Sequence, residues 1–168
     1  MARFAMDSEF KIISGGQTGV DRAALDVAMQ MGIETGGWCP KDRRAEDGRI
    51  PEYYQLTETR SSEVHVRTQR NVESSSATLV ITRGAPIGGT RFTVETAQSI
   101  RRPLLVIDLD DHLVDPVVTI LEWLRQSSPR VLNVAGPRES GAPGIGRETY
   151  IILEEVFNEL GYISTEEQ

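Results

Sequence analysis

Three short runs of aliphatic residues constrain the fold of this chain more than any other feature of its sequence. They span residues 77–81, 104–107 and 131–135, and each is continuous rather than alternating with polar positions. A similar run covers residues 10–13. Strands that are apolar on both faces are typical of a parallel sheet that helices cover on both sides.

Amphipathic helices are predicted between and after these strands. Apolar residues recur at intervals of three and four over residues 20–31, and Gly32 ends that helix. Asp115 and Pro116 are typical of a helix start, and residues 149–160 carry another apolar stripe. The alternation predicts an α/β fold, a Rossmann-like three-layer α/β/α sandwich with a mostly parallel sheet. A length of 168 residues suits one ligand-binding domain over residues 1–168.

Composition narrows the classes of partner and compartment. The chain has 25 Asp and Glu against 18 Lys and Arg, so we expect neither a nucleic-acid partner nor an anionic membrane surface. No apolar stretch could span a bilayer, and residues 1–7 are not typical of a signal peptide. Cys39 is the only cysteine, which excludes an internal disulfide and favours a reducing, cytoplasmic location. It has no second cysteine or histidine at ligand spacing, so no metal site is predicted.

A glycine-rich loop, residues 14–19, lies between the first predicted strand and the first predicted helix. Free backbone N–H groups at the positive end of a helix dipole favour a phosphate. Alternatively, the glycines only let the helix pack closely, and the loop has neither the Lys-Ser/Thr end of a P-loop nor the full spacing of a dinucleotide fingerprint. The candidate phosphate-binding residues are Gly15, Gly16, Gln17, Thr18 and Gly19.

Glycine-rich loops also follow the predicted strands at residues 77–81 and 131–135. Ligands of open parallel sheets bind at the carboxyl ends of the strands. Three such loops at one edge therefore predict a phosphate-bearing or otherwise anionic ligand. The candidates that these two loops add are Arg83, Gly84, Gly88, Gly89, Thr90, Thr93, Gly136 and Arg138.

Residues 36–51 show neither a helical nor a strand period, and loops of this length in small domains are often functional. Lys41, Arg43 and Arg44 form a basic cluster in a protein that is otherwise acidic. We therefore expect them to contact an anionic ligand. The alternative is a solvated loop whose charges nearly cancel. Trp38 could stack on a flat ring, but we expect it to cover the end of the core.

Two long motifs, residues 13–26 and 36–48, resemble the molybdenum cofactor carrier protein family. The resemblance extends to about Asp108. Shorter pieces that also fit are residues 70–72, 76–79 and 88–90. The resemblance implies a Rossmann-like, oligomeric protein within a wider lysine-decarboxylase-like group. That group includes phosphoribohydrolases of cytokinin nucleotides and single-stranded-DNA loaders.

The resemblance also implies a cargo. Family members are thought to bind the molybdenum cofactor, a pterin-dithiolene phosphate, without a covalent bond. They protect it and pass it to apo-molybdoenzymes or exchange it with cofactor-synthesis proteins. Carried over by position, Gly15, Gly16, Thr18 and Gly19 would hold phosphate, and Arg43 and Arg44 would contact anionic atoms. Asn71, Gly88, Gly89, Thr90 and Thr93 would complete the pocket.

An enzymatic alternative comes from the phosphoribohydrolase relatives. Glu95 follows the Gly88-Gly89-Thr90 motif by about one turn, and with Arg91 it could assist cleavage of an N-glycosidic bond. The same spacing is typical of an exposed helical ion pair, which is the interpretation we favour. A nucleotide-sensing module without cargo transfer is a third possibility, since it would share the same loops.

Overall fold

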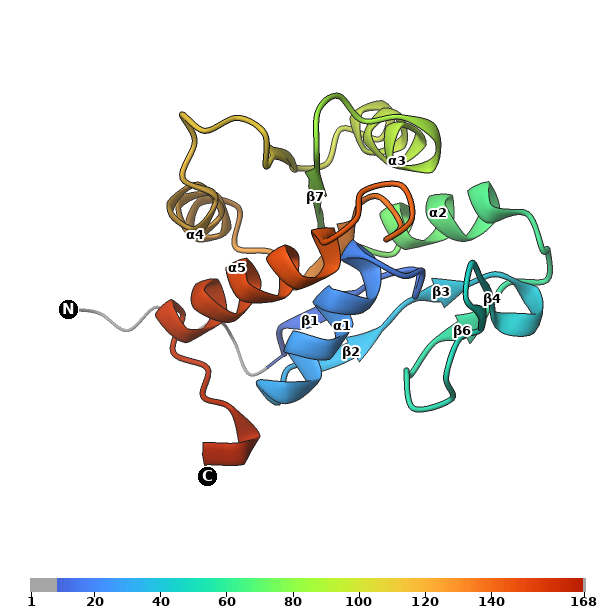
Figure 1. The fold of residues 1–168 in the computed structure, drawn as a ribbon, viewed down its shortest axis with the longest axis horizontal. Helices are drawn as coiled ribbons and strands as arrows, with labels where there is room; N and C mark the ends of the chain where they lie inside the picture. Colours follow the sequence, from blue (N-terminus) through green and yellow to red (C-terminus); the bar gives the residue numbers. More distant parts are fainter. Residues whose placement is uncertain (1–8, 168) are drawn as a thin grey trace.

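A five-stranded parallel sheet forms the centre of the protein (Figure 1). The computed structural model describes residues 9–167. The strand order is β2-β1-β9-β7-β8, so the last strand in the chain lies between the first strand and β7. The strands are β1 (Lys11–Ile13), β2 (Glu34–Gly36), β7 (Ala77–Thr82), β8 (Leu104–Asp108) and β9 (Val131–Ala135).

Helices cover both faces of the sheet, which confirms the predicted three-layer sandwich (Figure 1). On one face α5 packs against both α1 and α4, and on the other face α2 packs against α3. The bounds are α1 (Val20–Gln30), α2 (Val64–Glu73), α3 (Gly88–Ser99), α4 (Pro116–Ser127) and α5 (Ile145–Glu159). As predicted, Asp115 caps α4, and its carboxylate accepts a hydrogen bond from the Val118 N–H at 3.1 Å.

The main hydrophobic core lies between the sheet and α1, α4 and α5. Every residue of β7 is buried, as its continuous aliphatic run predicts. The edge strand β8 is buried less completely, and Val106 is exposed. No helix in the described part of the chain is long and apolar enough to cross a membrane.

Residues 36–51 were expected to be a structureless loop, and that expectation was wrong. Most of this segment belongs to residues 38–58, called the insert here, which fold into short elements. The insert contains β3 (Trp38–Cys39), the 3₁₀ turn η1 (Lys41–Arg43), the hairpin of β4 (Arg44–Ala45) and β5 (Gly48–Arg49), and β6 (Thr57–Glu58). Strand β6 pairs with β3. Cys39, Ile50 and Tyr54 form a second small core with Leu25 of α1. Two-residue strands are too short to produce a sequence period, which is why the prediction missed them.

Candidate ligand-binding pocket

A pocket of about 380 Å³ opens at the carboxyl ends of β1, β9 and β7. All three glycine-rich loops contribute to it, so the structure brings together the segments that the sequence predicted would meet. Of the predicted residues, those that line it are Gly15, Gln17, Asn71, Arg83, Gly88, Gly89, Thr90, Thr93, Gly136 and Arg138. One face of α2 closes the remaining side.

A buried ion pair between α1 and α2 lies beside the first glycine loop. The Arg67 Nη1 donates to Asp21 Oδ2 at 3.0 Å, and both side chains are nearly buried. A Cβ added to Gly15 would lie 1.6 Å from that Nη1, so the guanidinium rests directly against the glycine. Burial raises the pKa of Asp21, while the charge and hydrogen bond of Arg67 oppose this shift. Glycine at position 15 therefore makes room for the pair.

Two further arginines line the pocket and are more exposed than Arg67. Arg83 pairs with Asp110 at 3.0 Å and with Glu148, and Arg138 Nε lies 3.9 Å from Glu46. Asp21 is the one carboxylate among the described residues of the lining, against three arginines. Each of these arginines is paired with at least one carboxylate, and all of the partners except Asp21 lie outside the lining.

The first turn of α3 forms another wall. Gly88 and Gly89 have no preceding helical carbonyl for their N–H groups, and the positive end of the helix dipole lies there. Thr90 and Thr93 are buried behind them, and the Thr93 hydroxyl donates to the Gly89 carbonyl at 3.0 Å. Val64 and Ile87 line the same pocket, and these residues are 47% and 78% exposed. Polar and apolar surfaces are therefore combined in one site.

The remaining predicted residues of the first loop do not line this pocket. Gly16 faces the insert, since an added Cβ would lie 2.5 Å from Leu56 Cδ1. The Thr18 hydroxyl donates to Glu46 and accepts from the Glu139 N–H at 3.2 Å. Gly19 packs against the backbone of residues 137–139. Gly84, in the loop after β7, donates its N–H to Asp108 at 2.7 Å instead of lining the pocket.

Arg43 does not have its predicted contact with the ligand site. Its side chain is 5% exposed, and its guanidinium donates to the Ile50, Leu56, Pro51 and Tyr54 carbonyls at 2.8–3.3 Å. The fork of donors on an arginine fits such a ring of carbonyls, so this residue holds the insert together. Lys41 and Arg44 are exposed and do not line the pocket. Arg43 therefore lies outside the pocket lining, and its guanidinium is occupied by contacts within the insert.

Comparison with known proteins identifies the family. The model of the circularly permutated YpsA SLOG family matches residues 12–157. The chain belongs to this family. A crystal structure of a putative molybdenum carrier protein from Syntrophus aciditrophicus is similar, with 45% identity and a TM-score of 0.83. The alignment covers 87% of this chain and 93% of that one, and it confirms the predicted family resemblance. No curated protein matches the chain.

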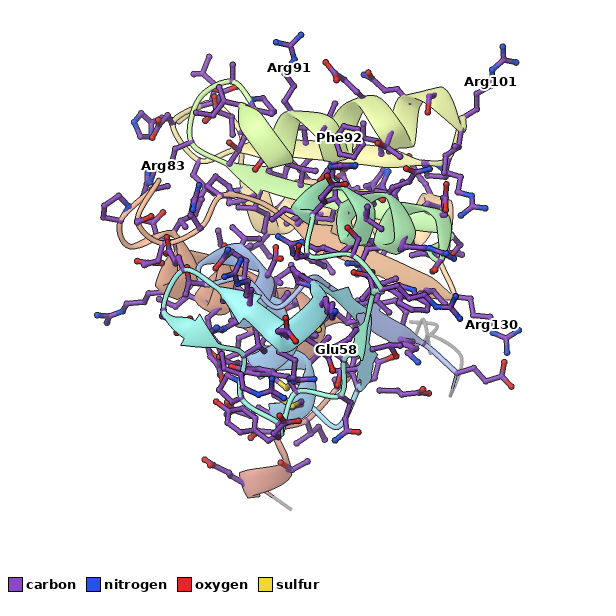
Figure 2. All side chains as sticks on the ribbon, turned by 90° about the vertical axis from the view of Figure 1, so that its right-hand side faces the viewer. Glu58, Arg83, Arg91, Phe92, Arg101 and Arg130 are labelled. Carbon is purple, nitrogen blue, oxygen red and sulfur yellow. The ribbon has the colours of Figure 1, made fainter. Side chains whose placement is uncertain are left out.

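In this member of the SLOG family, the positions of Arg91 and Glu95 do not support the phosphoribohydrolase alternative. Arg91 Nε and Glu95 Oε1 lie 2.7 Å apart on the exposed surface of α3, and neither residue lines the pocket. Figure 2 shows Arg91 pointing away from the sheet. The α3 residues that line the pocket are Gly88, Gly89, Thr90 and Thr93.

Asn71 has a structural role at the edge of the pocket. Its amide accepts from the Trp38 N–H at 2.8 Å and donates to the Trp38 carbonyl at 2.9 Å, which fixes β3 to α2. The Trp38 ring lies under Arg70, 5.5 Å from its guanidinium carbon, and does not line the pocket.

The sequence interpretation named Asn71 but missed the other three pocket residues on the same face of α2. Val64, Arg67, Thr68 and Asn71 line the pocket from this helix. Their spacing of i, i+3, i+4 and i+7 marks a single helical face. That spacing was the available signal, but the face is largely polar and the hydrophobic pattern did not reveal the helix.

The hairpin of residues 44–49, called the strap here, joins two glycine-rich loops of this SLOG fold. The Glu46 carboxylate accepts from the Thr18 hydroxyl, from the Ser140 hydroxyl and from the Ser140 N–H at 3.1 Å. The Gln17 side-chain carbonyl accepts the N–H groups of both Thr18 and Glu46 at 3.0 Å. Since Gln17 also lines the pocket, the strap and the pocket share a residue.

The strap should loosen in acid. The Ser140 and Thr18 hydroxyls lower the pKa of Glu46 below its ordinary value of 4.5, so the ionised contacts are complete above that value and are lost as the pH falls through the lowered pKa. We expect Glu46→Gln to speed amide hydrogen exchange in residues 44–49 at neutral pH, whereas Glu58→Gln on the exposed β6 should not. Equal exchange in Glu46→Gln and the wild type would show that the carboxylate does not hold the strap.

Proposed function

We propose that this protein binds the molybdenum cofactor in the pocket at the sheet edge, protects it and passes it to a recipient protein. The supporting observation is the composition of the pocket, which joins Arg67, Arg83 and the α3 N-terminus to the apolar Val64 and Ile87. The phosphate of the cofactor suits the first group and its flat pterin suits the second. The similar protein from Syntrophus aciditrophicus, named a putative molybdenum carrier protein, supports a molybdenum-related cargo.

A carrier role accounts for what the described pocket lining contains. Carriage requires binding and release, whereas hydrolysis of an N-glycosidic bond requires a carboxylate positioned near the sugar. The lining carboxylate, Asp21, is bonded to Arg67, and Glu95 lies outside the pocket. We therefore favour carriage over phosphoribohydrolase activity, with an apo-molybdoenzyme or a cofactor-synthesis protein as the transfer partner.

The retained small molecule is the direct test. The protein is purified natively from cells that make the cofactor, and its extract is oxidised in acid and examined by fluorescence and mass spectrometry. We expect a fluorescent pterin in proportion to the protein. A retained nucleotide instead would support a nucleotide sensor or an enzyme and contradict the carrier proposal.

Turnover is tested separately with purine nucleoside monophosphates. We expect no release of free base, and we expect Glu95→Gln to bind its cargo as the wild type does. Base release that disappears in Glu95→Gln would establish a phosphoribohydrolase.

We also propose that the protein is a homo-oligomer, and light scattering of the same preparation tests this.

A further inference from the structure

One buried donor on the pocket wall has no partner. Arg67 is about nine-tenths buried, yet its Nε makes no hydrogen bond to any residue that the structure describes. The hydrogen bond that its guanidinium does make, to Asp21, uses Nη1. A buried N–H of a charged group without an acceptor lowers stability, so such a group is expected to have a partner in the functional state.

The covalent geometry of arginine shows what the free donors can bind. Nη1 lies on the side of Cδ, so the other edge of the guanidinium carries Nε–H and one Nη2–H pointing in parallel. Two parallel donors match two oxygens of a phosphate or carboxylate. Asp21 holds Nη1 on the opposite side of the group, and the guanidinium lies close to Gly15. Asp21 thus holds one edge of the guanidinium, and no described residue accepts a hydrogen bond from Nε at the other edge, which is closed to solvent in this structure.

The surroundings favour an anion at this edge. Arg67 faces a pocket to which the α3 N-terminus contributes Gly88 and Gly89. The only described carboxylate of the lining is the one already bonded to Arg67. Val64, one turn earlier on α2, is 47% exposed, and Ile87 is 78% exposed, so the apolar surfaces lie towards the mouth.

We infer that Arg67 binds the phosphate of the ligand through Nε and Nη2, deep in the pocket, with the ring of the ligand directed towards Val64 and Ile87. This inference rests on the proposed function, because it assigns an orientation to the proposed cargo. It also moves the phosphate from Gly16, Thr18 and Gly19, where the sequence predicted it, to the space between Gly15, α2 and α3.

The test uses inorganic phosphate as the probe, with affinity measured by calorimetry. Arg67→Gln and Arg67→Lys should each bind phosphate at least about tenfold more weakly, since lysine keeps the charge but loses the parallel donors. Arg70→Gln is the matched control, because Arg70 is exposed one turn later on the same helix. It should bind phosphate as the wild type does.

Arg67→Gln leaves Asp21 buried without its cation, so the variant could fail to fold. The double variant Asp21→Asn with Arg67→Gln removes both charges and retains two amides that can bond to each other. It should unfold at nearly the wild-type temperature and still show the weakened phosphate binding. Wild-type affinity in a folded Arg67 variant, or no phosphate binding by the wild type, would overturn the inference.

These outcomes are separable from those of the carrier proposal. Arg67-dependent phosphate binding together with a retained nucleotide would uphold the Arg67 site and reject the molybdenum cargo. A retained pterin together with phosphate binding that is insensitive to Arg67 would do the reverse.

Discussion

Arg43→Ala is expected to lower the free energy of unfolding by about 4 kcal/mol, because four backbone carbonyls in the insert lose a charged donor at once. For a chain of this size that loss lowers the melting temperature by roughly 8–16 °C. Among the residues that the structure describes, no other side chain joins residues 50, 51, 54 and 56 in this way. The effect should therefore concentrate in the insert.

Cys39 reports on this effect directly. Its side chain is fully buried in the small core of the insert, and burial raises the pKa of its thiol, so it should react slowly with a thiol reagent. We expect the reaction to accelerate in Arg43→Ala. Arg44→Ala is the control, since Arg44 is exposed and its loss should change stability by no more than about 0.5 kcal/mol. A stable Arg43→Ala protein with weakened cargo binding would restore the ligand role predicted from the sequence.

Gly15→Ala is expected to weaken cargo binding by about 2–5 kcal/mol, which is roughly thirtyfold or more. The new Cβ would lie 1.6 Å from Arg67 Nη1 and 2.9 Å from Asp21 Oδ2. The end of the arginine can move, but only by leaving Asp21 and entering the space proposed for the phosphate. We therefore expect the affinity to fall, and the melting temperature to fall with it because Asp21 loses its buried partner.

The matched control for Gly15→Ala is Gly36→Ala. There the added Cβ meets the flexible end of Lys11, 2.8 Å from its Cε, and neither residue lines the pocket. Calorimetry with the extracted cofactor should give wild-type affinity for Gly36→Ala. If Gly15→Ala also binds normally, the guanidinium does not lie against the loop as described.

Gly16→Val should instead affect stability, because its side chain would meet Leu56 and Ile50.

The sheet was predictable where burial on both faces leaves a continuous aliphatic run. Strand β7 is the clearest case, since all six of its residues are buried. The sequence did not predict strand β2 or helix α2, and the reason differs between the two. The strand has only three residues, Glu34–Gly36, and the helix has mostly polar residues, because part of its inner face lines a pocket instead of a core.

The sequence predicted where in the fold the candidate site lies, but not which side chains contact one another there. Gly15, Gly88 and Gly136 were expected at one edge because parallel strands end there together. Arg43 and Arg67 are chemically identical, and what distinguishes them is contact across the fold. Arg43 meets carbonyls 7 to 13 residues away, whereas Arg67 meets Asp21 across 46 residues. A single sequence carries no local sign of either contact.

The central position of β9 has a consequence for the order of events during synthesis. Strands β1 and β2 pair with each other, as do β7 and β8, but β9 alone joins the two pairs in the central sheet that the structure describes. While residues 131–135 are still inside the ribosome, the part of the chain already outside can form only two separate half-sheets, and the inner edge of each is unpaired. Such edges are prone to pair with other chains. The pocket, which takes Asn133 and Gly136 from this strand and its loop, can close around a cargo only after this late strand has been inserted.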